Sequence, residues 1–198
     1  EELKVLLKET PEHAVIDYLC REGAAPFGAI EEGGYHHYAT YLKRQIQVEA
    51  EEKVPEGKMA KLLYDMYQPD CAKYAEESDV PQIYELLLEN FDLQADHIPS
   101  EDDLLQIVKE KEVMIYKIGD KIECFFIYRR EGKKLYCAFS YNHASADILY
   151  SIERRVKEIE YEENGIKMHY AWFNAENKKA LRRNAWKDTK IRDYIFVK

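Results

Sequence analysis

From Asp70 onward the chain alternates short apolar stretches with amphipathic ones, and this rhythm limits the possible folds more than any other feature of the sequence. Residues 122–128 are apolar on most of both faces at a period of two, as in a buried β-strand. Residues 145–164 carry apolar side chains at helical spacing, with Ser145 as the cap at the start and Gly165 just after the end, which predicts one long helix. The predicted order is β-α-α-β-β-β-α-β-α-β, an α+β pattern. The predicted strands of this part are residues 71–75, 113–118, 122–128, 135–140, 167–173 and 194–197.

The first 48 residues predict a shorter β-α-β-β pattern. A strand at 3–7 precedes a helix that starts at Thr10, because a hydroxyl residue followed by Pro and an acid is typical of a helix start. This helix carries Tyr18 and ends at Gly23. The two further strands of the pattern are predicted at residues 27–30 and 35–48.

The end of the sequence repeats the order of its beginning. Residues 166–198 predict strand, helix, turn and strand, which matches the order predicted for residues 3–44. A repeat of this kind indicates two copies of one domain type, the first shortened at its front. We therefore expect a partial unit at residues 1–48, a charged connector with a short helix at 49–69, and one whole domain at 70–198.

Charge is distributed unevenly along the chain. The net charge is −9 over 198 residues, which argues against extensive nucleic-acid binding. Residues 132–198 nevertheless carry 14 Lys and Arg against 9 Asp and Glu, a net charge of +5. The simpler interpretation is uneven surface solvation, and the alternative is an anion-binding site in the last third beside a cation-tolerant face in the middle.

Cysteine and histidine spacing gives no sign of a metal site. Cys20, Cys71, Cys124 and Cys137 form no CxxC pair, so we expect reduced thiols in a cytoplasmic protein. The imidazoles of His36 and His37 would point to opposite faces of a strand and could not easily share a metal. No apolar run approaches the roughly 20 residues of a membrane span, and we expect no membrane partner.

The element order over residues 70–198 resembles that of the GNAT superfamily of acyl-CoA-dependent N-acyltransferases. The segment CREGAAPFGAIEE followed by HHYATYLKR is similar to the closing helix and strands of a second such domain. The resemblance implies a mixed, mostly antiparallel central sheet with helices on both faces, within a tandem protein whose first unit is truncated. It also implies acetyl-CoA or another acyl-CoA as a substrate, no metal cofactor, and a small-molecule or peptide amine as the acceptor.

The cofactor motif of this family is Arg or Gln, two residues, Gly, one residue, then Gly or Ala, and it falls on the loop before the long helix. Small residues let the backbone approach a pyrophosphate, to which helix N-terminal N–H groups donate. Ala146 fits the motif, Ala144 is small but not Gly, Tyr141 replaces the usual donor, and Asp147 adds an opposing charge. The cofactor-binding residues implied here are Phe139, Ser140, Tyr141, Asn142, His143, Ala144, Ser145 and Ala146.

A second family signature falls on a helix predicted at residues 174–185. Asn174 matches its first position, and Lys178 and Arg182 would complement the phosphates of coenzyme A. Leu181 stands where the family often has a Tyr that protonates the leaving thiolate, and Leu cannot donate a proton.

Three residues are candidates for catalysis. His97 lies in an acidic loop, residues 92–99, which in this family borders the acceptor site. Glu123 is an alternative base, and Tyr18 has nearly the position of the family's general acid within the partial unit. The preferred function is direct transfer of an acyl group to an amine. The alternatives are a catalytically degenerate GNAT-like module that binds a ligand or partner, and a structural half of a tandem protein; the sequence leaves oligomer formation open.

Overall fold

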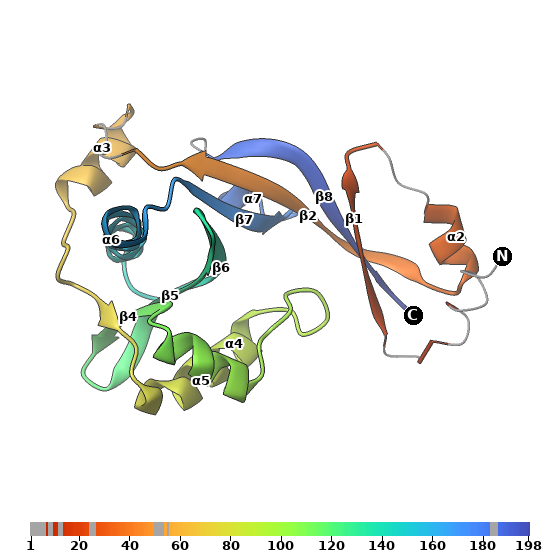
Figure 1. Cartoon of the computed structure of the whole chain (residues 1–198), viewed down its shortest axis with the longest axis horizontal. Coiled ribbons are helices and arrows are strands. Elements are labelled where there is room, and N and C mark those ends of the chain that lie inside the picture. Colours follow the sequence, from red (N-terminus) through yellow and green to blue (C-terminus); the bar gives the residue numbers. More distant parts are fainter. Residues whose placement is uncertain are drawn as a thin grey trace. The chain divides into compact units, whose positions relative to one another are not determined.

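The computed structural model of this chain describes residues 7, 10–11, 14–23, 27–49, 54, 56–182 and 186–198 (Figure 1). Among them are eight strands, which are mostly antiparallel. The strands are β1 (Val15–Arg21), β2 (His36–Gln47), β3 (Lys73–Tyr74), β4 (Val113–Ile118), β5 (Lys121–Glu131), β6 (Lys134–Asn142), β7 (Met168–Asn174) and β8 (Lys187–Val197). The helices are α2 (Phe27–Glu32), α3 (Lys58–Asp65), α4 (Val80–Asn90), α5 (Glu101–Lys109), α6 (Ala146–Asn164) and α7 (Lys178–Leu181).

The chain forms two compact units, which we name by the parts of the sequence they contain. The terminal unit comprises Glu1–Ile46, Asp92–His97 and Ala171–Lys198, and the central unit comprises Gln47–Phe91 and Ile98–Tyr170. Strand β7 begins in the central unit and ends in the terminal unit. The division of the sequence into 1–48, 49–69 and 70–198 stays a prediction.

In the central unit the strand order is β7-β6-β5-β4-β3. Strands β4, β5 and β6 form an antiparallel meander, and tight turns at Gly119 and Gly132 connect them. Both glycines have φ near +60°, a backbone conformation that other residues adopt only at a cost. Strand β7 joins β6 in parallel, which requires a crossover connection, and α6 supplies it.

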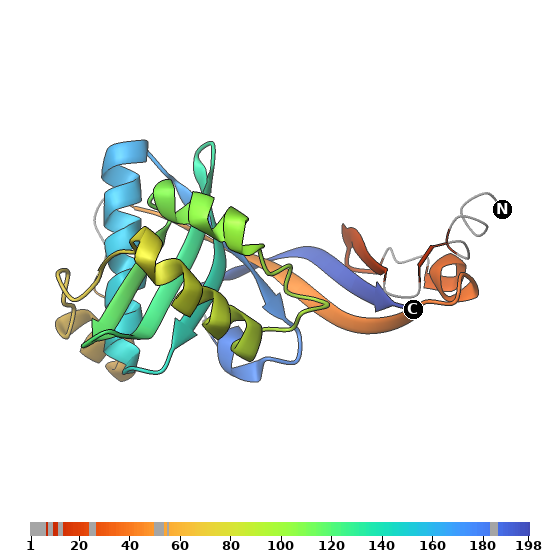
Figure 2. The same ribbon diagram turned by 90° about the horizontal axis from the view of Figure 1, so that it is seen from below.

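Helices cover both faces of this sheet (Figures 1 and 2). Phe125 and Ile127 of β5 pack in one core cluster with residues of α4 and α5. Phe126 and Tyr128, which point the other way, pack in a second cluster with residues of α6. Burying each of these side chains contributes about 1.5–3 kcal/mol. The prediction of a strand that is apolar on both faces is confirmed.

A buried ion pair fixes the far end of α6 to β5. Glu160 is fully buried, and both of its oxygens accept hydrogen bonds from Arg130, at 2.7 Å from Nε and 2.7 Å from Nη2. The Tyr128 hydroxyl donates to the same carboxylate at 3.0 Å. Because the carboxylate is bidentate and satisfied, its burial beneath the helix is tolerated.

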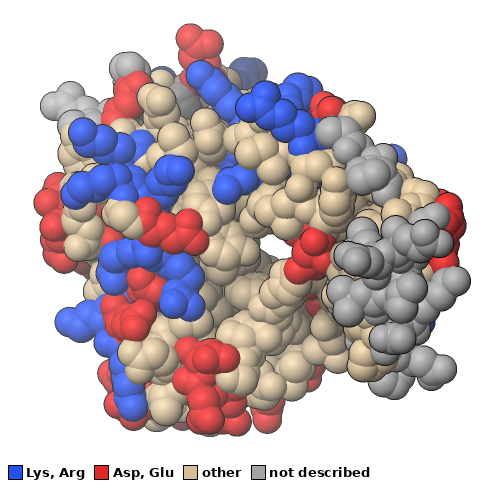
Figure 3. Space-filling model, turned by 45° about the vertical axis from the view of Figure 1, so that its right-hand side comes forward, with Lys and Arg blue, Asp and Glu red and all other residues tan. Residues whose placement is uncertain are grey.

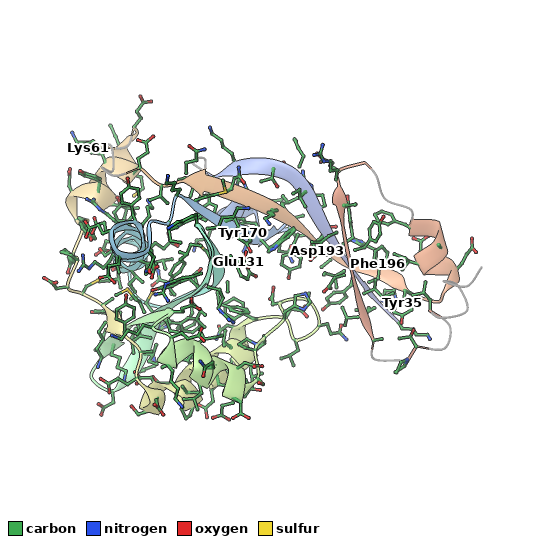
Figure 4. The ribbon with its side chains drawn as sticks, viewed as in Figure 1. Tyr35, Lys61, Glu131, Tyr170, Asp193 and Phe196 are labelled. Atoms are coloured by element: carbon green, nitrogen blue, oxygen red, sulfur yellow. The ribbon has the colours of Figure 1, made fainter. Side chains whose placement is uncertain are left out.

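In the terminal unit the strand order is β1-β8-β2-β7, and β8 runs antiparallel to both β1 and β2. The core of this unit includes Tyr35 and Phe196, whose side chains Figure 4 labels near the end of β8. The rings of Phe27 and Phe196 meet edge to face with centroids 5.3 Å apart. Residues before position 48 therefore supply both strands, β1 and β2, that pair with β8.

Three sequence predictions for individual elements are wrong. The helix predicted from Thr10 to Gly23 is the strand β1, whose alternate residues are exposed. The strand predicted at 27–30 is the helix α2, and the helix predicted at 174–185 is reduced to the single turn of α7. Residues 183–185, and all but Leu7 of the strand predicted at 3–7, lie outside the described residues.

The overall fold class is nevertheless confirmed: a mixed, mostly antiparallel sheet with helices on both faces of its central part. Among the described residues, none of the helices combines the length and the apolar character that a membrane span needs.

Candidate functional site

The end of strand β6 has an open edge. Its pairing with β7 covers only Lys134 to Tyr136, whereas β6 continues to Asn142. Beyond Tyr136, the described strands of the central unit give β6 a partner on one side alone, which is β5. At Phe139 and Ser140, backbone groups that point to the other edge have no strand partner among the described residues of the central unit.

A β-bulge lies within this open segment. Ile127 of β5 faces Phe139 while the next residue, Tyr128, faces Cys137, so Ala138 has no residue opposite it. A bulge bends the strand and takes backbone groups out of the ladder, and bulges are frequent next to active sites. Sequence reasoning missed this feature, because the pattern of residues 135–140 carries no Gly or Pro to indicate it.

The loop after β6 leads to the N-terminus of α6, which has no side-chain cap. Ser145 occupies the N-cap position with extended backbone, yet its side chain makes no capping hydrogen bond. The prediction that Ser145 starts the helix is confirmed, but the capping bond is absent. Ala146 opens a helix of 19 residues, whose first N–H groups and dipole present positive charge here. Asp147 partly offsets that charge.

Two other amides of this loop are already engaged. The N–H groups of His143 and Ala144 donate to the backbone carbonyl of Glu123, at 2.8 and 3.2 Å. The side-chain amide of Asn142 donates to the backbone carbonyl of Ser145 at 3.2 Å. These bonds fix the shape of the loop, and any anion bound here would use the N–H groups at the start of α6.

Glu123 holds two groups that can carry positive charge beside the loop. Its Oε1 lies 2.8 Å from Lys121 Nζ, and its Oε2 lies 2.7 Å from His143 Nδ1. Hydrogen bonds from Lys121 and then His143 hold the pKa of Glu123 below its usual value. A carboxylate with a lowered pKa accepts protons less readily, so this environment suits an anchor better than a general base. Lys121 is a member of the site that sequence reasoning missed.

Lys and Arg side chains lie beside Asp and Glu side chains on the face shown in Figure 3. Lys178 and Arg182 of the terminal unit are exposed, and no described acidic side chain lies within ion-pair distance of either. Asn174 accepts a hydrogen bond from the N–H of Glu176 at 2.8 Å, which closes a turn before α7. Phe139 to Ala146 belong to the central unit, whereas Asn174, Lys178 and Arg182 belong to the terminal unit.

The acidic loop at residues 92–97 is tied to β2. The hydroxyl of Tyr38 donates to Asp92 Oδ2 and that of Tyr41 donates to Asp96 Oδ1, each at 2.6 Å. His97, at the end of the loop, has a positive φ of 48° and lies 3.1 Å from Asp17, measured from Nε2 to Oδ2. The loop therefore has a defined shape, and two of its carboxylates accept hydrogen bonds from Tyr hydroxyls.

Tyr18 lies on β1 and faces Tyr194 of β8, where it packs against the core of the terminal unit. The expected helical position of Tyr18 is therefore wrong, because the residue belongs to a strand. The carbonyl of Leu181 accepts a hydrogen bond from Arg44 Nη1 at 2.9 Å, and its side chain offers no proton. The catalytic roles of His97, Glu123 and Tyr18 stay predictions.

Comparison with solved structures gives the fold a wider context. A GCN5-related N-acetyltransferase from Sphaerobacter thermophilus matches 94% of this chain with a TM-score of 0.63 and 14% identity. A GNAT-family protein from Novosphingobium aromaticivorans matches 99% of the chain with a TM-score of 0.59 and 14% identity. A tandem GNAT protein from the clavulanic acid biosynthesis pathway matches 99% of the chain with a TM-score of 0.58 and 7% identity.

These matches concern the fold, because the sequence identities are low. The chain spans 60% of the Sphaerobacter protein, 80% of the Novosphingobium protein and 66% of the tandem protein. No protein-family model matches the chain, and no curated protein matches it. The predicted resemblance in fold is confirmed by these solved structures, although the two comparisons by sequence find no match.

Proposed function

We propose that this chain, which has the fold of the GCN5-related N-acetyltransferases, binds acetyl-CoA or another acyl-CoA and transfers the acyl group to an amine. The observation that carries the proposal is the open edge of β6 directly before the uncapped N-terminus of α6. Both features lie in one continuous segment of the central unit, and each would offer backbone N–H groups to a ligand. The whole protein's acceptor, a small molecule or a peptide, is part of the same proposal.

The binding step uses the start of α6. Its N–H groups would donate to the pyrophosphate, and the small side chains of Ala144 and Ala146 leave room for the phosphates to approach. Lys121 and His143, both held by Glu123, would add positive charge beside them. In the terminal unit, the exposed Lys178 and Arg182 are separate candidates for contacts with phosphate groups.

The chemical step uses the edge of β6. An N–H group near Phe139 or Ser140 would donate to the thioester carbonyl and stabilise the negative charge that develops on its oxygen. The neutral amine attacks the carbonyl carbon, a C–N bond forms, and the C–S bond breaks with its electron pair on sulfur. The amine nitrogen loses a proton to solvent and the thiolate takes one from solvent, because the sequence position where the family often has a proton donor is Leu181.

Calorimetric titration with acetyl-CoA tests the binding step, with free CoA and ATP for comparison. We expect micromolar binding of acetyl-CoA and CoA, about −8 kcal/mol, and no comparable binding of ATP. Absence of acetyl-CoA binding at about 1 mM would contradict the proposal.

The variant Ala146→Glu places a carboxylate at the first position of α6. We expect it to weaken acetyl-CoA binding at least about tenfold, because its charge opposes the phosphates. Leu88→Glu is the matched control, since Leu88 is an exposed residue of α4 and receives the same new charge. Equal affinities for the two variants would remove the start of α6 from the binding site.

A second candidate function is binding without turnover. Leu181 favours it, because the position has no proton to give the leaving thiolate. Acetyl-CoA binding combined with no release of free thiol across a panel of amines would favour this degenerate module over the transferase.

A further inference from the structure

Three side chains that can ligate a metal come together in the terminal unit, although they are distant in the sequence. Asp17 lies on β1, Asp193 lies on β8, and His97 ends the loop at residues 92–97. One ligating atom from each lies within 4.8 Å of the other two. Figure 4 labels Asp193 on β8.

The sheet itself brings the two carboxylates together. In the antiparallel pairing of β1 with β8, Asp17 faces Ile195 and Leu19 faces Asp193. Asp17 and Asp193 are therefore diagonal neighbours on the same face of the sheet. The arrangement does not depend on a long flexible side chain.

The loop carries His97 to the same face. Asp193 also faces Tyr41 of β2, and the Tyr41 hydroxyl donates to Asp96, the residue directly before His97. Ala95 of the loop is buried against Tyr41 and Ile195. These contacts hold the loop beside Asp193, and His97 Nε2 lies 3.1 Å from Asp17 Oδ2.

Asp193 gives a second, independent indication of a ligand. Its Oδ1 is buried and has no hydrogen-bond partner among the described residues. No described Lys or Arg pairs with either carboxylate, so the buried oxygen lacks the compensation that buried carboxylates normally have.

We propose that Asp17, His97 and Asp193 bind one divalent metal ion. Two carboxylates and one imidazole form a mixed oxygen and nitrogen ligand set, which suits Mn²⁺ or Zn²⁺. Metal–ligand distances of about 2.0–2.2 Å place the ligand atoms of one ion about 3–4 Å apart, so small side-chain rotations complete the site. The exposed side chains of Asp17 and His97 leave positions for water.

Such an ion would link β1, β8 and the loop at residues 92–97. It would neutralise the buried oxygen of Asp193 and fix His97 in its left-handed backbone conformation. The proposal concerns binding alone and does not depend on the transferase activity proposed above.

Titration with Mn²⁺, followed by the loss of the free-ion signal in electron paramagnetic resonance, tests the site. Mn²⁺ is the probe because it prefers oxygen ligands, whereas Zn²⁺ would also bind the four free cysteines. We expect one Mn²⁺ per chain, displaced by Zn²⁺. No binding at about 1 mM Mn²⁺ would overturn the proposal and leave a His97–Asp17 ion pair.

Variants locate the bound ion. Asp193→Asn and His97→Ala should each weaken Mn²⁺ binding at least about tenfold. His36→Ala is the matched control, since His36 is an exposed histidine of the same unit, and it should leave the affinity unchanged. Asp17→Asn, a change at a more exposed ligand, separates lost binding from lost folding. Binding that survives all three ligand variants, or that is lost in His36→Ala, would overturn the assignment.

Discussion

At the residue scale, His169 shows how burial alone changes the chemistry of a side chain. It is 3% exposed on β7, and its Nε2 is buried without a hydrogen-bond partner among the described residues. Burial, and then the nearby charge of Lys157, lowers the pKa of His169 to about 3. The imidazole is therefore neutral in the folded protein at any pH near neutrality, and His169 contributes packing rather than acid–base chemistry.

This lowered pKa predicts a sensitivity to acid. An unfolded histidine takes up a proton below about pH 6.5, whereas folded His169 does not until about pH 3, so the unfolded state gains protons first. Stability should fall as the pH drops below 6.5. Between pH 7.5 and 5, His169 should account for a loss of about 2 kcal/mol in the free energy of unfolding.

The variant His169→Phe checks this expectation in urea unfolding experiments at the two pH values. We expect the variant to lose about 2 kcal/mol less than the natural chain over this range. Leu19→Ala, at an exposed position without a titratable group, should leave the pH dependence unaltered. A His169→Phe variant with the same pH dependence as the natural chain would show that the imidazole is protonated in the folded state.

At the element scale, the two ends of α6 differ in how they are bonded to the rest of the unit. Its first turn has no side-chain cap, while its last turns are fixed by the buried Glu160 and its partner Arg130. An element that positions a binding site needs such an anchor, because a small tilt of a 19-residue helix would move its first turn relative to the edge of β6.

The anchor can be tested by Glu160→Gln. The change leaves Arg130 partly buried with a weaker partner, and breaking a buried ion pair typically costs 3–5 kcal/mol. We expect about 3 kcal/mol here, because Glu112 also lies near Arg130. Glu162→Gln, on an exposed part of the same helix, should change stability by less than about 0.5 kcal/mol. Similar losses in the two variants would assign the effect to helix charge rather than to the buried pair.

The elements also show what the sequence could predict. The long helix and the strands β4 to β7 were predictable, because their periodicity and turns are local signals. Strand β1 was not. The residues Ala14, Val15, Tyr18 and Leu19 recur at helical spacing, but in the structure Val15 and Leu19 are exposed, whereas Ile16 and Tyr18 point inward. A short apolar stretch fits either period, and here pairing with the distant β8 decides it.

The candidate site, too, was predictable from the sequence only in part. The loop from Phe139 to Ala146 was found through its resemblance to a family motif. The bulge at Ala138, the role of Lys121 and the grouping of Asp17 with His97 and Asp193 depend on strand register, which a single sequence does not reveal.

At the scale of the whole molecule, the two units carry different spectroscopic signals. Both tryptophans of the chain, Trp172 and Trp186, lie in the terminal unit, whereas the four longest helices among the described residues lie in the central unit. Tryptophan fluorescence therefore reports mainly on one unit and helical circular dichroism mainly on the other.

The variant Phe196→Ala uses this difference. Phe196 is fully buried in the terminal unit, and removing such a ring typically costs 3–5 kcal/mol. We expect a large shift of the fluorescence transition in denaturant and a smaller shift of the circular dichroism transition. Leu19→Ala, at a residue that is 57% exposed, should move neither transition appreciably. Equal shifts of both transitions in Phe196→Ala would show that the units unfold as one cooperative body.

The position of β8 between β1 and β2 has a consequence for synthesis on the ribosome. Strands β1 and β2 emerge early, but the strand that separates and pairs them is made after every other described strand. The central unit can begin to fold while translation continues, whereas β1 and β2 wait with unpaired edges until β8 arrives. Until β8 is made, the nascent chain therefore exposes strand edges that could pair with the wrong strand.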